Sequence, residues 1–367
     1  MKKLLLSILA VAALASCSKI DVEYDAPAEI GLSPVAQNIT RSMVSGTTFP
    51  EEQFNVWAFY KQMDAGTSIA DWQKSTLTQQ RYIDHKPFKK KEGKDLWGGL
   101  TPYYWPKVGS LLFAGYYPVN DALKAKVSYL FDTDNNTMTI AGYTPGNYKE
   151  TGFVNNAENA DHVEDLMYFN MTATSYDGTT VGEKNTVTTG SNVDVVFRHA
   201  LSWITVKVAK GEDTPEDATI TVNSVTFTDV KTTGTGTVDN SATTEDPKVD
   251  PKEITWVTTE DETDIVVFEG TEVLGDAKAL PKEPVIIPQT MAGSLVVNYT
   301  ISSGDYSSFT EEKTITLSGM NDSDGNSLTK WLAAKHYIYT ITIGTTEILI
   351  DPAVTAWDEV TVGVPVQ

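Results

Sequence analysis

Apolar residues alternate with polar ones in many short runs along this chain, and turn-forming residues separate the runs. A period of two places every second side chain on one face of an extended strand, so that one face is buried while the other meets solvent. Such a chain can bury its apolar faces only by pairing strands into sheets and packing the sheets together. We therefore expect an all-β protein made of antiparallel β-sandwiches. The clearest runs are residues 54–60, 193–197, 204–208, 295–301 and 337–343.

Helical signal is limited to three short segments, "DALKAKV", "DHVEDLM" and "LTKWLAAKH", each too short to be stable without tertiary support. We expect them to be connectors. In "VDVVFRHALSWITVKV" the apolar positions are odd-numbered up to Phe197 and even-numbered from Ile204. One straight strand cannot keep both sets on the same face, which predicts a bulge or bend around residues 199–202.

The chain has 367 residues, more than one compact core usually supports, so two domains are expected. Between Tyr168 and Asn192 the sequence turns polar and rich in Gly, Thr and Ser, and strand signal resumes at Val193. We place the boundary near residue 190. The predicted domains are residues 42–190 and residues 191–367.

The N-terminus, "MKKLLLSILAVAALASCSK", has a basic start, a short apolar run and small residues, as export signals do. Its apolar run is shorter than the roughly 20 residues of a membrane-spanning helix. The chain's single cysteine, Cys17, follows Leu14-Ala15-Ser16, which resembles the bacterial lipobox. Residues 1–17 are therefore predicted to be a lipoprotein signal, with a thioether lipid attached at Cys17. The alternative is an ordinary secretory signal with an unrelated cysteine.

The composition argues against several kinds of chemistry. A formal net charge of −21 disfavours nucleic acid or an anionic membrane face as partner. The four histidines, His85, His162, His199 and His336, show no zinc-ligand spacing, and His199 and His336 are expected to have structural roles. The loops beginning at Asp132 and Asn321 resemble calcium loops only in composition. We predict no catalytic residue, no metal and no cofactor; carboxylate pairs for a glycosidase would arise by chance among 49 acidic residues.

Aromatic residues at Trp97, Tyr103, Tyr104 and Trp105 lie close together in the sequence. They could stack on sugar rings as a glycan-binding platform. The alternative is ordinary packing, because aromatic side chains carry large apolar area in β-sandwiches.

The C-terminal tail continues the strand pattern almost to the last residue, where chain ends usually turn polar. An apolar strand at this place needs a sheet to bind. One alternative is a final strand or hairpin paired within its own domain, which suits Ile348 and Ile350, and the other is donation to a neighbouring molecule. Because that contact runs head to tail and does not close, it builds a filament. The predicted donor segment is about residues 346–367, with side chains Val354, Ala356, Val360, Val362, Val364 and Val366.

Arg41, in "NITRS", is one of the chain's arginines, together with Arg81 and Arg198. The segment before it, with apolar residues at 30, 32, 35 and 39, reads as a first strand. A cut after Arg41 would release that strand and leave an apolar groove that the tail of another copy could fill. Arg198 lies in a predicted strand that a protease cannot easily reach, so Arg81 is the other candidate target.

The chain resembles the fimbrillin family, the subunits of protease-assembled type V pili of Gram-negative anaerobes. The resemblance runs in pieces across most of the sequence: the lipobox at Cys17, "TRSMVSGTTFPEEQFNVWAFY", "YYWPKVGSLLFAGYYP", "EDLMYF", "VDVVFRHALSWITVKV", "VIIPQTMAGSLVVNYTI" and "KHYIYTITIGTTEILIDPAVTAW".

The resemblance implies two tandem transthyretin-like antiparallel β-sandwich domains and a structural subunit of a surface fimbria that supports adhesion, without enzymatic activity. It implies export as an outer-membrane lipoprotein precursor and cleavage by an arginine-specific protease. Residues 18–41 would be a propeptide carrying the first strand, Arg41 would precede the cut, and Ser42 would begin the mature subunit. The partners would be other pilin subunits, with a host glycan or protein as a further candidate.

Two alternatives stay open at this point. The first is a permanently lipid-anchored surface protein that binds glycan. The second is a fimbrial tip or anchor subunit, although an anchor has no use for a cleavage arginine because it keeps its lipid.

Overall fold

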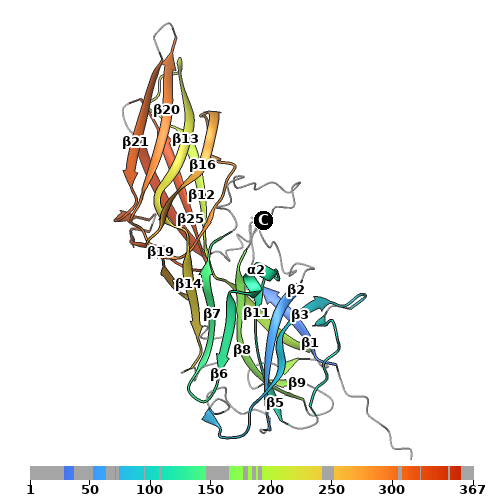
Figure 1. Cartoon of the computed structure of the whole chain (residues 1–367). Coiled ribbons are helices and arrows are strands. Elements are labelled where there is room, and N and C mark those ends of the chain that lie inside the picture. Colours follow the sequence, from blue (N-terminus) through green and yellow to red (C-terminus); the bar gives the residue numbers. More distant parts are fainter. Residues whose placement is uncertain are drawn as a thin grey trace, which may run out of the picture.

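The computed structural model describes residues 29–36, 53–62, 71, 74–94, 96–106, 109–145, 165–176, 181–183, 187–188, 192–241, 252–304, 308–322, 324–345 and 348–356. Nearly all regular structure in these ranges is β-strand, and α2 (Asp121–Lys124) is a single helical turn. None of the helices in the described ranges is long and apolar enough to cross a bilayer. Figure 1 shows an elongated molecule with two β-rich lobes, which confirms the all-β expectation.

The lower lobe in Figure 1 is built on one large sheet. Its strand order is β10-β9-β8-β11-β1-β4-β3-β2-β5, and β8 also pairs with β5, so the sheet closes on itself. The strands are β1 (Gly31–Ala36), β2 (Gln53–Lys61), β3 (Gln80–Lys90), β4 (Trp97–Gly99), β5 (Ser110–Tyr117), β8 (Met167–Tyr176), β9 (Val181–Glu183), β10 (Val187–Thr188) and β11 (Asn192–His199).

Strands β2 and β5 are buried on both faces because they separate two hydrophobic cores. Side chains at alternate positions, such as Phe54 and Phe113, point into the core inside the closed sheet, which we call the inner core. The intervening side chains, such as Trp57 and Leu112, pack in a second core outside it. Every residue of β5 is buried. The sequence run at residues 54–60 therefore marks one face of a strand whose other face is also covered.

The second core of the lower lobe is covered by a smaller sheet of order β15-β14-β7-β6. These strands are β6 (Val127–Phe131), β7 (Asn136–Tyr143), β14 (Gly234–Asp239) and β15 (Thr255–Thr258). The sheet thus joins two strands from the first half of the sequence to two strands from the second half. Strand β14 pairs with β7 from Gly234 opposite Tyr143 to Asp239 opposite Thr137. The division near residue 190 remains a prediction, and strands from both of its sides meet in this sheet.

The upper lobe consists of two sheets around one core. One has the order β17-β12-β25-β26, with β18 paired to β12, and the other has the order β16-β13-β20-β21. The core between them contains Ile204, Phe227, Tyr339 and their neighbours. The strands of this lobe, including the short two-stranded pairings β19-β24 and β22-β23, are β12 (Ser202–Lys210), β13 (Ala218–Lys231), β16 (Glu262–Val273), β17 (Lys278–Ala279), β18 (Val285–Ile286), β19 (Gln289–Thr290), β20 (Ser294–Ser303), β21 (Phe309–Thr316), β22 (Met320–Asn321), β23 (Ser327–Leu328), β24 (Lys330–Trp331), β25 (Lys335–Ile343) and β26 (Ile348–Ala356).

The change of apolar phase after Phe197 marks the passage of the chain from one sheet to another. Strand β11 ends at His199 in the lower sheet, and β12 begins at Ser202 in the upper lobe. The buried residues Ala200 and Leu201 connect them. The break falls where the sequence predicts it, and its cause is that the two strands bury their side chains in different cores.

One predicted helix is wrong. The segment at residues 328–336 forms strand β24 and the start of β25. Trp331 is buried in the upper core, where its indole Nε1 donates a hydrogen bond to the Tyr339 hydroxyl at 2.9 Å. This tertiary contact outweighs the local helix preference of the leucine and alanine residues. In "DALKAKV", residues 121–124 form α2. In "DHVEDLM", residues 161–164 lie outside the described ranges, residues 165–166 are not helical and Met167 begins β8.

Replacing Ile140 with alanine should destabilise the lower lobe strongly. Ile140 is fully buried on β7, facing the second core and paired with Gly236 of β14. A large-to-small change in such a core typically costs about 2–5 kcal/mol of unfolding free energy. Leu130, which is 53% exposed on β6, is the matched control and should change by less than about 0.5 kcal/mol on truncation. Chemical denaturation measures both, and equal effects would contradict the described packing.

Candidate functional site

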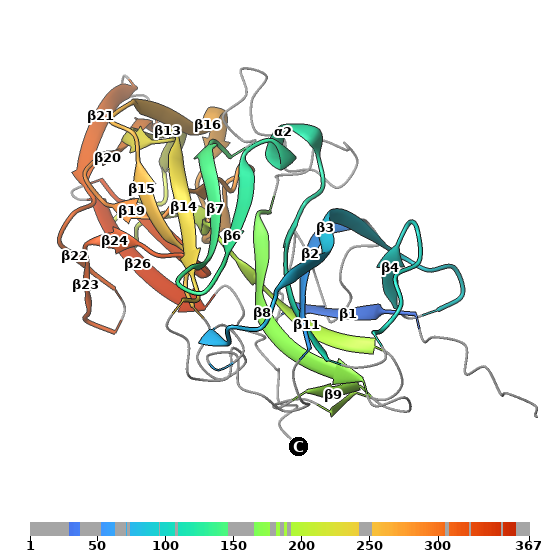
Figure 2. The same cartoon turned by 60° about the horizontal axis from the view of Figure 1, so that its bottom comes forward.

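Strand β1 lies in the interior of the closed sheet although it comes from the N-terminal end of the described chain. On one side it pairs in parallel with β11 along its whole length, from Gly31 opposite Asn192 to Ala36 opposite Phe197. On the other side it pairs antiparallel with β4 at a single position, Leu32 opposite Trp97. Figure 2 shows β1 between these two neighbours. Without β1, the sheet would be open between β11 and β4.

Side chains in β1 and directly before it complete the inner core. Ile30 and Leu32 are fully buried in it, next to Val193, Val195 and Phe197. Each of the two contributes roughly 1.5–3 kcal/mol by removal from water. Loss of the strand would therefore expose apolar side chains of β11 as well as the backbone groups that its ladder satisfies.

The residues just before β1 are tied to the loop after β4. The Ile30 backbone N–H donates to the Tyr103 carbonyl oxygen at 2.7 Å, and Glu29 forms an isolated bridge with Tyr104. The first strand is thus anchored at its N-terminal end and along β11, with little pairing to β4 itself.

The residues predicted to act in processing lie outside the described ranges: Cys17, Arg41 and Ser42. Of the predicted donor residues, Val354 and Ala356 belong to β26, where they pair with Tyr337 and Lys335 of β25. Both are half-buried in their own lobe. The others, Val360, Val362, Val364 and Val366, also lie outside the described ranges.

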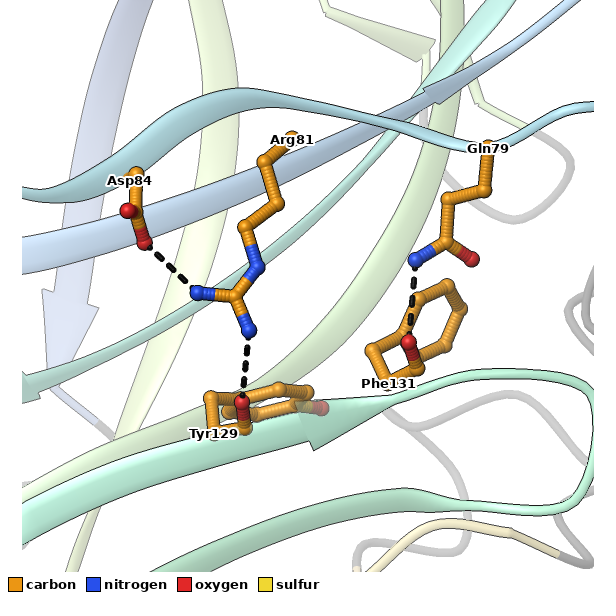
Figure 3. A network of polar contacts seen from close by, with 5 residues as sticks. All are labelled: Gln79, Arg81, Asp84, Tyr129 and Phe131. Atoms are coloured by element: carbon orange, nitrogen blue, oxygen red, sulfur yellow. Dashed lines mark hydrogen bonds and ion pairs between the residues drawn. The ribbon is translucent and has the colours of Figure 1, made fainter.

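Arg81 is held in place by polar contacts that join two sheets of the lower lobe. Its Nη1 donates to Asp84 Oδ1 at 3.0 Å, and its Nη2 donates to the Tyr129 carbonyl oxygen at 3.3 Å. Figure 3 shows Gln79 beside it, donating to the Phe131 carbonyl at 3.0 Å. The backbone of Arg81 pairs with Phe59 of β2. A protease that needs an extended, free backbone therefore finds Arg81 engaged in a paired strand.

Arg198 is also part of a paired strand. It lies in β11, opposite Tyr168 of β8, and is half-buried. Neither arginine of the described chain lies in an open loop.

The sequence matches the family model described as "Fimbrillin-like" over residues 57–357. The chain belongs to the fimbrillin-like family. This confirms the resemblance found in the sequence. The family is one of structural fimbrial and adhesion proteins, which implies a cell-surface fimbria and assembly with other subunits. No curated protein matches the sequence significantly.

Solved structures similar to this fimbrillin-like chain include a fimbrial protein from Bacteroides vulgatus. It has 15% sequence identity and a TM-score of 0.56, covering 89% of this chain and 99% of the other. At this identity the likeness shows a shared fold. The tip fimbrial protein Mfa3 from Porphyromonas gingivalis, with a C-terminal truncation, also matches, with 9% identity, a TM-score of 0.38 and coverage of 90% and 100%.

The aromatic cluster of this fimbrillin-like chain is mostly core. Trp97 and Trp105 are each 4% exposed and belong to the inner core, while the Tyr103 ring stacks on Phe88 at 6.2 Å between centroids. Tyr104 is 44% exposed. The two tryptophans cannot offer their faces to a sugar ring in this arrangement, so packing is the better explanation of the cluster.

The two loops with calcium-like composition use their aspartates to hold turns. Asp132 Oδ1 accepts hydrogen bonds from the backbone N–H groups of Asp134 and Asn135, both at 2.8 Å. These bonds hold the pKa of Asp132 below its usual value. Asp322 caps the second loop in the same way, accepting from the N–H groups of Asp324 and Asn326. Among the described residues no three potential metal ligands cluster.

Three histidines have structural partners. His199 Nδ1 lies 2.9 Å from Asp165 Oδ1, with both side chains buried. His336 stacks on Trp203 at 3.6 Å between ring centroids, and burial lowers its pKa to about 4, with nearby Lys207 acting in the same direction. Burial also lowers the pKa of His85 to about 4, where the ring stacks on Trp57. His162 lies outside the described ranges.

Acidification from pH 6.5 towards pH 4 should lower the stability of the fold through His336. In the unfolded chain a histidine binds its proton near pH 6.5, whereas folded His336 does so only near pH 4. The unfolded state therefore binds more protons in this window, and stability falls as pH falls. His336→Gln removes the titration, so its unfolding free energy should drop less than that of the wild type between pH 7 and pH 5. Identical pH dependence of urea denaturation in the two proteins would contradict the assignment.

Proposed function

We propose that this chain is a fimbrial subunit that polymerises by strand exchange after proteolytic removal of its first strand. The precursor is exported as an outer-membrane lipoprotein with lipid on Cys17. An arginine-specific protease cuts after Arg41, so that the mature subunit begins at Ser42. Strand β1 then leaves, and the C-terminal tail of another copy takes its place in the sheet.

The observation that carries this proposal is the position of β1. The strand is interior to the sheet, yet the chain beyond Ala36 reaches Arg41 after a few residues. A cut at Arg41 would leave β1 attached to the subunit only by noncovalent contacts. Because β11 supplies nearly all of its pairing within the described residues, the strand has one strong neighbour rather than two.

A subunit that has lost β1 would be stabilised by binding another strand. Val193, Val195 and Phe197 would meet water, and the β11 backbone would lose its ladder partners. An incoming strand with apolar residues at every second position satisfies both demands. The tail supplies such a pattern at Val360, Val362, Val364 and Val366, beyond the end of β26 at Ala356.

The polymer would be a stalk-like filament, because the groove and the tail are different parts of the chain. Such a contact is heterologous and repeats without closing. A permanent lipid anchor would need to keep Cys17, so cleavage at Arg41 disfavours the anchor role. A tip position and adhesion to a host glycan or protein are further candidate roles.

Changing Arg41 to lysine should prevent maturation by an arginine-specific protease, whereas Arg81→Lys should not. The precursor is treated with the protease, its N-terminus is sequenced, and its assembly is followed as a ladder on a gel run without boiling. Wild type and Arg81→Lys should both begin at Ser42 and form ladders. Cleavage of the Arg41→Lys precursor at Arg81, or ladders without any cleavage, would overturn the proposed maturation.

Deleting the residues after Trp357 should abolish ladders while leaving a folded monomer. The deletion spares β26, which ends at Ala356 and pairs with β25 along its length. The monomer should therefore keep the circular dichroism spectrum and melting behaviour of the wild type. If the truncated subunit still polymerises after cleavage, the tail is not the donor strand.

A further inference from the structure

A lysine at the end of β3 marks where the first strand begins. Lys91 Nζ lies 3.0 Å from Glu29 Oε1, and it also donates to the Gly99 carbonyl oxygen at 2.9 Å. The Lys91 and Glu29 side chains are 28% and 32% exposed. One ammonium group thus joins the ends of β3 and β4 to the residue that precedes β1. We call this contact the entry latch.

The residues after Glu29 follow a fixed pattern relative to the latch. Ile30, Gly31, Leu32 and Pro34 are buried, Ser33 is half-buried, and the side chains of Ile30 and Leu32 lie in the inner core. A strand that occupies this place therefore presents a carboxylate at the latch, followed by inward apolar side chains at the first and third positions and a buried residue at the fifth.

The tail repeats this pattern. Residues 29–36 read "EIGLSPVA", and residues 359–366 read "EVTVGVPV". Aligned at the glutamates, Val360, Val362 and Val364 correspond to Ile30, Leu32 and Pro34. Glu359 directly precedes Val360 as Glu29 directly precedes Ile30, so the two glutamates fix the alignment.

We propose that residues 359–366 of a second copy occupy the place of residues 29–36 in the same direction and register, with Glu359 bound to Lys91. This inference rests on the proposed strand exchange and specifies its geometry. Val360 and Val362 fill the spaces of Ile30 and Leu32 with slightly smaller side chains, and Val364 replaces Pro34 with a somewhat larger one. Pro365 takes the place of Val35, which pairs with Val196 one step before the last pair of the ladder. Its missing N–H therefore affects only the end of the strand.

The latch selects the register rather than supplying most of the affinity. An ion pair at a partly exposed position contributes little to the binding affinity by itself. A wrong alignment, however, would leave the Glu359 carboxylate unpaired or bring a like charge next to Lys91, and both arrangements are disfavoured. In a chain of net charge −21, a lysine at the mouth of the groove also offsets repulsion between two acidic copies.

Cysteine pairs test the register directly. The chain's single cysteine, Cys17, is removed with the propeptide, so introduced cysteines have no competitor. Leu32 pairs with Val193, and both side chains point into the inner core. If Val362 takes the place of Leu32, a subunit carrying Val193→Cys and Val362→Cys should form disulfide-linked ladders. Neighbouring strands lie roughly 4.8 Å apart, which suits a disulfide.

The matched control carries Val193→Cys and Val364→Cys. Both subunits are cleaved and oxidised, then run on boiled, non-reducing gels. Only the first should give covalent ladders. Covalent ladders from the control pair instead would mean a tail shifted by two residues or inserted in the opposite direction, and would overturn the proposal. Ladders on unboiled gels confirm that each variant still assembles.

Charge exchange tests the latch. Lys91→Glu and Glu359→Lys should each slow ladder formation by about two- to tenfold, as expected for loss of one partly exposed ion pair with added repulsion. The double variant restores the pair at every contact between copies and should recover the wild-type rate. Lys89→Glu, at an exposed residue of β3 two positions before Lys91, is the control with an equal charge change. Folding of each precursor is checked by thermal melting, because Lys91→Glu also faces Glu29.

Wild-type rates in both single variants, or no recovery in the double variant, would overturn the role of Lys91. Failure of the wild-type chain to form ladders would instead remove the proposed strand exchange, and the register with it. The two failures are therefore distinct.

Discussion

The lower lobe depends on the closure of its sheet by β1 between β11 and β4. This segment places Ile30 and Leu32 in the inner core, and its backbone pairs with one edge of β11. The same closed sheet presents the outer faces of β2 and β5 to the second core, which the β15-β14-β7-β6 sheet covers. One core thus lies inside the closed sheet and the other against its outer face, and the sheet is closed only while a strand fills the β1 position.

A protein whose sheet accepts strands must keep its other strand edges from pairing with copies of itself. The carbonyl groups of Tyr129 and Phe131 on β6 are already bonded to the side chains of Arg81 and Gln79. The edge strand β21 carries exposed charges at Glu311, Glu312 and Lys313. Both devices place side chains where another strand would otherwise pair with β6 or β21.

The sequence predicts local features of this fold well, because alternation reports directly which side chains are buried. Phe54, Val56 and Ala58 share the inner core as their spacing indicates, and the phase change after Phe197 falls at the passage between sheets. The period-two pattern could not reveal that β2 and β5 are covered on both faces. The helical signal at residues 328–336 was misleading, because Trp331 is instead buried in the upper core next to strand β25.

The candidate site was harder to predict than the fold. The sequence indicates a strand before Arg41 but cannot say that it runs parallel to β11, because strand pairing depends on contacts far apart in the chain. The Lys91 contact with Glu29 likewise joins residues with no local pattern between them. The aromatic cluster shows that closeness in sequence can also mislead. Its tryptophans are packed in the inner core and do not form a surface platform.

The antiparallel sheet of β6, β7, β14 and β15 has a consequence for the order of folding. Synthesis proceeds from the N-terminus, so β7 is made well before β14, its partner in the ladder. The second core of the lower lobe cannot be covered until residues up to about 258 have followed. The lower lobe therefore depends on β14 and β15, from the second half of the chain, to cover its second core.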